Sequence, residues 1–225
     1  MTCFKFKRSV PKPKVSPPMA NDFNETICMD LKIFKKRNLI ILYIIDMFTR
    51  FTVAKIIPDK RPESVIKVLL DCWILNLFGA PRRILFDNGG EFYNAKMKDL
   101  CHNFNIKFIS TGAESPWQNG MCEKNHAQVD LTMAKIVEDQ PNITMEEALS
   151  SAIYSKNMLT NTHGYSPVQL VTGAQPRIPS AIDNMPPAME TVSSVESVRK
   201  RLNALFAARR AFVQVENSRR LNAAL

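Results

Sequence analysis

The stretch Leu39-Ile-Ile-Leu-Tyr-Ile-Ile-Asp46 decides the fold of this chain, because it is rich in β-branched residues up to its final carboxylate. Two similar apolar runs stand beside it, at residues 26–33 and 51–57. The connectors at 35–38 and 47–50 are short and polar or mixed. Short connectors favour antiparallel neighbours, so the sequence predicts a three-stranded antiparallel meander.

The hydrophobic period changes from two to 3.6 residues after Pro62, which indicates a helix. Gly79 and Pro81 predict its end. The positions that recur at three- and four-residue steps in it are Val65, Ile66, Leu69, Leu70, Trp73, Ile74 and Leu77. The same analysis predicts strands at 82–87 and 106–111 and helices at 94–104, 118–138 and 145–160.

The predicted order is therefore βββαβαβα followed by a further helix. Strands that alternate with helices join through crossovers and are expected to be parallel. We predict an α/β fold with a mixed five-stranded sheet flanked by helices, which is typical of the ribonuclease H-like architecture.

The two ends of the chain differ from this middle part. Residues 1–22 form a basic arm rich in lysine and proline. We divide the chain into this arm, a core domain at 23–180 and a C-terminal segment at 181–225. Between 164 and 194 the composition predicts an irregular linker. Beyond it, Val198, Leu202, Leu205 and Phe212 lie among arginines, which predicts a basic amphipathic helix without a core of its own.

Composition narrows the class of partner. The 225 residues carry a net charge of +9 and a pI near 9.4, which favours a polyanion such as nucleic acid. The five cysteines form no CxxC pair, so neither a disulfide framework nor a zinc site is expected, and a reducing intracellular setting follows. The longest apolar run, seven residues, is too short to span a membrane.

Three carboxylates stand out against this background, and each has an ordinary explanation. Asp30 interrupts an apolar strand, where it could simply face solvent. Asp87 begins Asp87-Asn-Gly-Gly90, which could be a hairpin turn, although a helical pattern follows it. Glu123 lies near the start of a helix, where a negative charge also complements the helix dipole. Asp46 is a competing strand carboxylate, and we read His102 and His126 as structural or solvent-facing residues.

The arrangement of these residues resembles the D,D-35-E signature of retroviral and Ty3/gypsy-like retrotransposon integrases. Thirty-five residues separate Asp87 from Glu123. The flanks Asp87-Asn-Gly-Gly-Glu-Phe92 and Pro116-Trp-Gln-Asn-Gly-Met-Cys-Glu123 are similar to the family's two most specific segments, and 162–176 is similar to the stretch that closes its core. Phe86 and Lys124 depart from the residues common there, which concerns the subfamily and not the metal ligands.

The resemblance implies that Asp30, Asp87 and Glu123 are catalytic residues that bind two Mg²⁺ or Mn²⁺ ions. The implied activity is DNA integration by 3′-end processing and strand transfer, that is, a polynucleotidyl transferase with endonuclease activity. Implied partners are element-end and target DNA and at least a second copy of the chain, without a membrane, and the implied place of action is the nucleus. We expect Asn119, Lys124 and Gln128 to contact DNA phosphates, since basic and amide side chains make most such contacts.

The ends of the chain also resemble parts of that family. Cys3 matches the last ligand of its zinc domain, but the other ligands are absent, so we expect no zinc within this chain. The ending at 199–225 is similar to the connector before the family's C-terminal DNA-binding domain. We expect a fragment that lacks both flanking domains.

Two other hypotheses of function are compatible with the same residues. The chain could be a ribonuclease H-like nuclease that cuts and never joins. Alternatively it could be a non-catalytic DNA-binding or assembly module derived from an integrase.

Overall fold

The computed structural model describes residues 20–34, 38–86, 89–110, 116–160, 162, 165–174, 207–208, 211–215, 217–218 and 221. The strands are β1 (Thr26–Phe34), β2 (Leu39–Asp46), β3 (Thr52–Ile57), β4 (Arg83–Phe86) and β5 (Lys107–Ser110). The helices are α1 (Pro62–Leu69), η2 (Leu70–Phe78), α2 (Ala95–Asn103), α3 (Pro116–Asp139), α4 (Met145–Leu159) and α5 (Pro167–Thr172). No helix among the described residues is long and apolar enough to cross a membrane.

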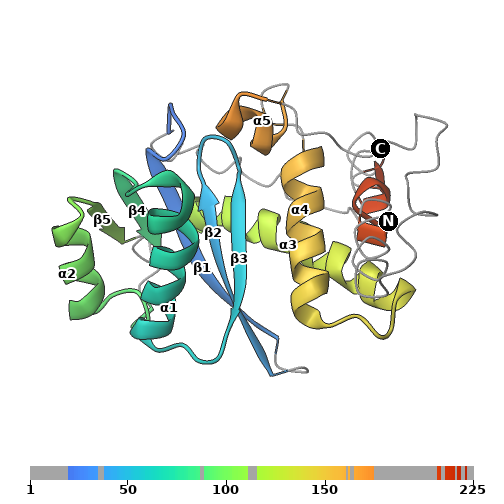
Figure 1. Ribbon diagram of the computed structural model, residues 1–225, viewed down its shortest axis with the longest axis horizontal. Coiled ribbons are helices and arrows are strands. Elements are labelled where there is room, and N and C mark those ends of the chain that lie inside the picture. The colour runs from blue at the N-terminus through green and yellow to red at the C-terminus, as the bar shows by residue number, and fades with distance from the viewer. Residues whose placement is uncertain are drawn as a thin grey trace, which may run out of the picture.

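The five strands form one mixed sheet in the order β3-β2-β1-β4-β5 (Figure 1). The first three strands are antiparallel neighbours, as the short connectors predict. Strand β4 then pairs parallel with β1, and β5 pairs parallel with β4, each after a helical crossover. The predicted fold class is confirmed.

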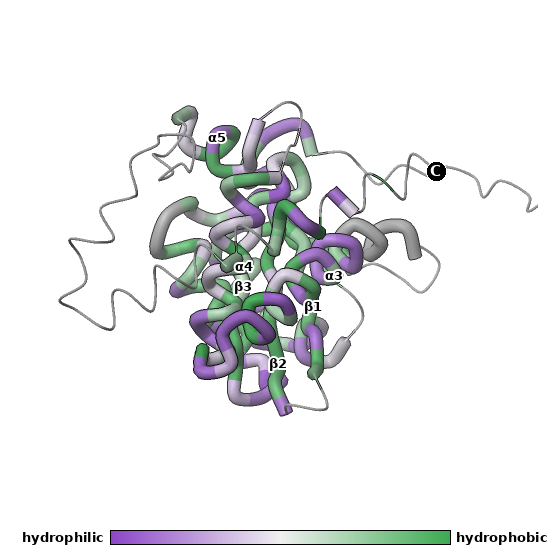
Figure 2. Tube along the Cα trace, turned by 90° about the vertical axis from the view of Figure 1, so that its right-hand side faces the viewer, coloured by the Kyte–Doolittle hydropathy of each residue, from purple (hydrophilic) through white to green (hydrophobic). Residues whose placement is uncertain are grey.

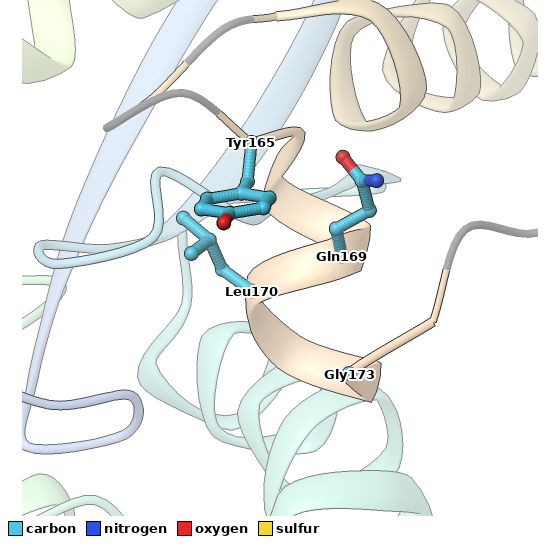
Figure 3. Close-up of a pocket in the computed structure, with 4 residues that line it drawn as sticks. All are labelled: Tyr165, Gln169, Leu170 and Gly173. Carbon is cyan, nitrogen blue, oxygen red and sulfur yellow. The ribbon is translucent and has the colours of Figure 1, made fainter.

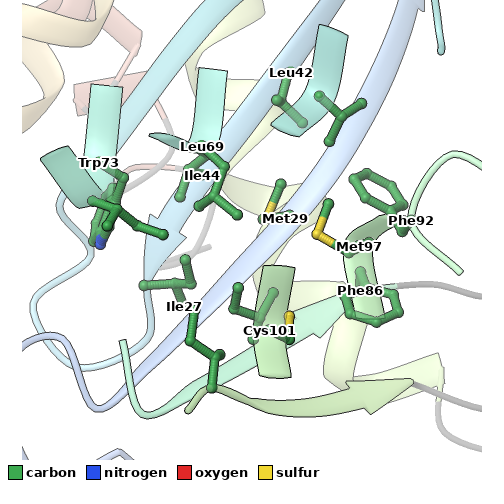
Figure 4. Close-up of a cluster of buried hydrophobic side chains, with 14 of the residues drawn as sticks. Ile27, Met29, Leu42, Ile44, Leu69, Trp73, Phe86, Phe92, Met97 and Cys101 are labelled. Atoms are coloured by element: carbon green, nitrogen blue, oxygen red, sulfur yellow. The ribbon is translucent and has the colours of Figure 1, made fainter. Parts of the chain in front are cut away.

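Alternation along the strands sends apolar side chains to both faces of the sheet, because successive residues point to opposite sides. On one face Ile27, Met29 and Ile44 are fully or almost fully buried in a cluster with Trp73 of η2 and Met97 of α2 (Figure 4). On the other face β2 packs in a second cluster against α3 and α4. Strands β1, β2 and β3 accordingly show mostly hydrophobic colour, while helices α3 and α4 show both colours (Figure 2).

The helix predicted to follow Pro62 forms, but its second half widens into a π-helix. The Gly79 N–H donates to the Ile74 carbonyl, five residues back, at 3.1 Å. Wider turns bring residues five apart closer to one face, and the rings of Trp73 and Phe78 have centroids 5.1 Å apart. Asn24 holds this end, since its side chain donates to the Phe78 carbonyl. Gly79 then leaves the helix with a φ of +70°.

The segment predicted to be irregular from residue 164 contains helix α5, so that prediction was wrong for Pro167–Thr172. Ser166 and Gln169 form a reciprocal capping box at its start. Gly173 ends the helix in the left-handed conformation. The helix has only six residues, too few to show a helical period, and the composition of the surrounding segment concealed its capping signals.

Parts of the predicted C-terminal helix are described, and they are helical. Ala208, Phe212 and Val215 are buried, and Ala208 belongs to the same cluster as residues of α3 and α4. Lys135 of α3 also donates to Gln214 at 3.1 Å. The described parts lie beside α3 and α4 (Figure 1). The arginines at 199, 201, 209, 210, 219 and 220, Lys200 and the basic arm up to residue 19 lie outside the described residues.

Asp46 organises the turn between β2 and β3. Its Oδ1 accepts hydrogen bonds from the Phe48 and Thr49 backbone N–H groups and from the Thr49 hydroxyl. Its Oδ2 accepts from the Asn24 N–H at 3.0 Å. The residue is fully buried, and this burial raises the pKa of its carboxyl, while the four hydrogen bonds act to lower it. The Asp46 carboxylate therefore has a structural role as a hydrogen-bond acceptor.

Lys156 joins α4 to the start of edge strand β3. Its ammonium donates to the Arg50 carbonyl at 2.5 Å and to the Thr52 hydroxyl at 2.6 Å. Asn157 adds a pair of hydrogen bonds with the Thr52 backbone, 3.0 and 2.8 Å long. Helix α4 thus covers one end of an edge strand. Burial and the nearby Arg50 charge lower the pKa of Lys156 to about 7.

Asp46→Ala should lower the free energy of unfolding by about 2 to 4 kcal/mol, because each buried donor left without an acceptor costs about 1–3 kcal/mol. Urea unfolding measures this. Asp71→Ala is the matched control, since Asp71 is exposed and pairs with Lys67 on the helix surface, where such pairs are worth about 0.5 kcal/mol or less. Equal effects of the two substitutions would contradict the structural role of Asp46.

Lys156→Met should flatten the dependence of stability on pH. In the folded chain the pKa of Lys156 is about 7, below its ordinary 10.5, so between these values the unfolded chain binds more protons and stability rises with pH. The contribution of Lys156 to the free energy of unfolding is complete above pH 10.5 and is lost as the pH falls towards 7. From pH 7 to 9.5 the wild type should gain roughly 1 kcal/mol per pH unit more than Lys156→Met in urea unfolding. Parallel pH profiles would show that Lys156 is not held in this environment.

Candidate active site

Asp30 lies in the middle of β1, opposite Tyr43 in the antiparallel register. Its neighbours Met29 and Leu31 belong to the apolar cluster on one face of the sheet, so alternation places Asp30 on the other face. That face is covered by α3. The Asp30 side chain is 30% exposed, so it is accessible from the edge of a packed interface.

Helix α3 contacts β1 at two points that are spaced equally along the helix and the strand. His126 contacts Asp30, with 3.3 Å between Nδ1 and Oδ2, and four residues later Asp130 forms a hydrogen-bonded ion pair with Lys32. Two strand residues rise about 6.6 Å and four helix residues about 6.0 Å, so the two elements stay in register over these steps. Glu123 lies one turn before His126 on the same helix.

His126 is packed between the helix and the sheet. It is 4% exposed, and its ring lies 4.1 Å from that of Tyr43 between centroids. Burial lowers the pKa of His126 to about 4, and the charges of Lys32 and Lys156 act in the same direction. Nδ1 faces the carboxylate, and Nε2 is buried with no hydrogen-bond partner among the described residues.

A second polar contact anchors the start of α3. The Asn125 side chain donates to the Thr52 hydroxyl at 3.0 Å, and this hydroxyl also accepts from Lys156. The first turns of α3 are therefore tied to β1 through His126 and to β3 and α4 through Thr52. Glu123, two residues before Asn125, is exposed.

The predicted site residues are placed as follows. Asp30 and Glu123 lie on the strand and the helix that meet at His126. Asp87 and the Asn119 side chain lie outside the described residues. Lys124 is exposed, whereas Gln128 is 6% exposed, so the described conformation offers a DNA backbone little of the Gln128 side chain. Its predicted role in DNA binding is not supported by this burial.

The donor chemistry fits a hard divalent cation in part. Asp30 and Glu123 supply carboxylate oxygens, the ligands that Mg²⁺ prefers. Among the described residues, no group of three or more His, Cys, Asp or Glu side chains could hold a metal ion. The third predicted carboxylate, Asp87, directly follows β4, the parallel neighbour of β1. The three-carboxylate site therefore stays a prediction.

Sequence reasoning missed the contact of His126 with Asp30. The signal available was the spacing of four that relates Cys122, His126 and Asp130 along one face of a helix. Cys122 shares a buried cluster with Cys28, two residues before Asp30. The spacing does not say which residues these side chains contact, because their partners are set only when α3 docks on β1.

A cavity elsewhere has different chemistry. It has a volume of about 320 Å³ and is lined by Tyr165, Gln169, Leu170 and Gly173 (Figure 3). It lies at α5 and is lined by none of the predicted carboxylates.

Comparison with known proteins agrees with the resemblance. The family described as Integrase core domain matches residues 20–116, a range that contains Asp30 and Asp87 and ends before Glu123. The chain is 26% identical over 100 residues to the Gag-Pro-Pol polyprotein of Human T-cell leukemia virus 2, which covers 44% of this chain and 7% of the polyprotein. It is 27% identical over 118 residues to that of Mason-Pfizer monkey virus, covering 51% of this chain and 6% of the polyprotein. The chain thus spans less than a tenth of the length of these relatives.

Solved structures share the fold. The HTLV-2 integrase catalytic core domain in complex with magnesium superposes with a TM-score of 0.58 at 21% identity, over 67% of this chain and 97% of that one. A chain of the simian T-cell lymphotropic virus intasome in complex with PP2A regulatory subunit B56 gamma gives a TM-score of 0.66 at 24% identity, over 80% of this chain and 67% of that one. Residues 20–116 therefore match the integrase core domain, and the fold of the chain is that of integrase catalytic cores.

Proposed function

We propose that this core catalyses polynucleotidyl transfer for DNA integration, with Asp30, Asp87 and Glu123 as its catalytic carboxylates. The observation that carries the proposal is the docking of α3 on β1, with His126 against Asp30 at 3.3 Å. This contact supports the proposal because it docks the helix that carries Glu123 on the strand that carries Asp30. The integrase core family and the fold supply the class of reaction.

The chain's own residues would act by position and charge. Asp30 is fixed by the sheet, and Glu123 is fixed by a helix that is itself anchored through Asn125 and His126. We propose that these carboxylates and Asp87 hold two Mg²⁺ or Mn²⁺ ions. When bound, such ions stabilise developing charge and activate water or a 3′-OH for attack on a phosphodiester. Without cations the negative side chains repel one another.

DNA would approach the exposed side of the site. Lys124, next to Glu123, is exposed and suits contact with a phosphate, and we assign the same role to Asn119. The net charge of +9 supports a nucleic acid partner. We further propose that the core acts as at least a dimer, and acts on chromosomal DNA in the nucleus.

The carboxylates are tested by Asp30→Asn, Asp87→Asn and Glu123→Gln in an oligonucleotide assay with Mg²⁺ or Mn²⁺. Each should reduce joining by at least about 100-fold, because bound metal ions are worth several kcal/mol of transition-state stabilisation. Asp99→Asn, at an exposed position on α2, is the matched control and should join as the wild type does.

The same assay separates the other two functions. Cleavage without joining by the wild type would indicate a nuclease. Binding of DNA with neither activity would indicate a binding or assembly module. Joining that survives in all three carboxylate variants would refute the assignment of the site.

Lys124→Glu should weaken DNA binding several-fold and reduce its dependence on salt, because each lost phosphate contact removes counterion release. Fluorescence anisotropy at several salt concentrations measures both quantities. Lys55→Glu makes the same charge change at an exposed position of β3 and should have the smaller effect. If Lys124→Glu binds as tightly as the wild type, the residue does not touch DNA.

A further inference from the structure

His126 is a buried polar residue that has no role in the proposed chemistry so far. It lies on the side of α3 that meets the sheet, and it is 4% exposed. One nitrogen, Nδ1, faces Oδ2 of Asp30 at 3.3 Å. The other nitrogen is buried with no hydrogen-bond partner among the described residues. Its placement needs an explanation, because burying a polar ring costs free energy.

The ring is held in one orientation by its surroundings. Tyr43 packs against it at 4.1 Å between centroids and is itself fully buried. The Tyr43 hydroxyl donates to Asp130 at 3.2 Å, and Asp130 lies one turn further along α3, where it pairs with Lys32. The helix, the Tyr43 ring and the strand therefore fix where Nδ1 points.

The geometry makes His126 a donor to Asp30 and not a ligand in its own right. Nδ1 is directed at the carboxylate, and the ring is almost fully buried, whereas Glu123 is exposed. A carboxylate has about four lone-pair sites, so one hydrogen bond to Oδ2 leaves capacity for a cation. Groups that hold a metal-binding side chain in this way fix its orientation.

We infer that His126 is a positioning residue, which donates a hydrogen bond from Nδ1 to Asp30 and holds this carboxylate in the orientation that binds a divalent cation. The inference rests on the proposed function, since it gives Asp30 the role of a metal ligand. It adds a residue outside the three carboxylates. It also gives the register between α3 and β1 a direct effect on the site.

The test compares His126→Asn with His126→Leu. These two side chains have nearly the same shape, and both remove the contact with Tyr43, but only asparagine keeps an N–H donor. Binding of Mn²⁺ alone is measured from the free-ion signal in electron paramagnetic resonance. We expect His126→Leu to lose about 10- to 100-fold in affinity, the usual effect of removing a partner of a metal ligand, and His126→Asn to stay within about 3-fold of the wild type.

Three controls give each result a meaning. Asp30→Asn defines binding without the carboxylate, His102→Leu makes the same change at an exposed histidine of α2, and thermal unfolding without metal reports on folding. Equal Mn²⁺ affinity in His126→Leu and the wild type would overturn the inference, and so would equal losses in His126→Leu and His126→Asn. A wild type that binds no more Mn²⁺ than Asp30→Asn would overturn the proposed function as well.

A measurement on the wild type covers variants that fail to fold. In ¹⁵N spectra of histidine-labelled protein, the ring of His126 should carry a proton on Nδ1, the nitrogen that faces Asp30. The three histidines of the chain are distinguished by substituting His102 and His163 in turn. A proton on Nε2 alone would refute the inference, because Nδ1 could then accept but not donate.

Discussion

The register of α3 on β1 is the constraint on which the rest of the site depends. Apolar packing alone holds a helix on a sheet without fixing how far it slides, since a hydrophobic contact has no direction. The pairs His126 with Asp30 and Asp130 with Lys32 are directional and lie one helical turn apart. A slide by one residue would break both pairs. The position of Glu123 along the strand is thus fixed by polar contacts that lie deeper than Glu123 itself.

Several polar and charged groups join the elements around the ends of β2 and β3. Asp46 closes the turn between β2 and β3, Lys156 ties α4 to edge strand β3, and Asn125 ties α3 to the same point through Thr52. Such groups are costly to bury unless they are hydrogen-bonded, and these make specific bonds to other elements. They link the ends of β2, β3, α3 and α4 into one arrangement, on which α3 presents its exposed residues.

The sequence was most informative where a periodic pattern was long. The three apolar runs gave the meander, and the later strands and helices followed from alternation and from the 3.6 period. The change to a π-helix at Leu70 was not predictable, because it depends on packing of Trp73 and Phe78 near Asn24, about fifty residues away along the chain. Helix α5 was missed because a six-residue helix has too few turns to show a period, although its capping box was present in the sequence.

By itself, the sequence determined the fold class, the order of the strands and helices, and the three carboxylates with the spacing that resembles the integrases. These follow from side-chain period and from local motifs, which are properties of neighbouring residues. Tertiary structure alone decided which groups face one another. It turned a histidine read as structural or solvent-facing into a buried partner of Asp30, and an amide expected at the DNA surface, Gln128, into a buried side chain. The physical reason is that the faces of α3 acquire partners only when the helix docks on β1, which lies about ninety residues earlier in the chain.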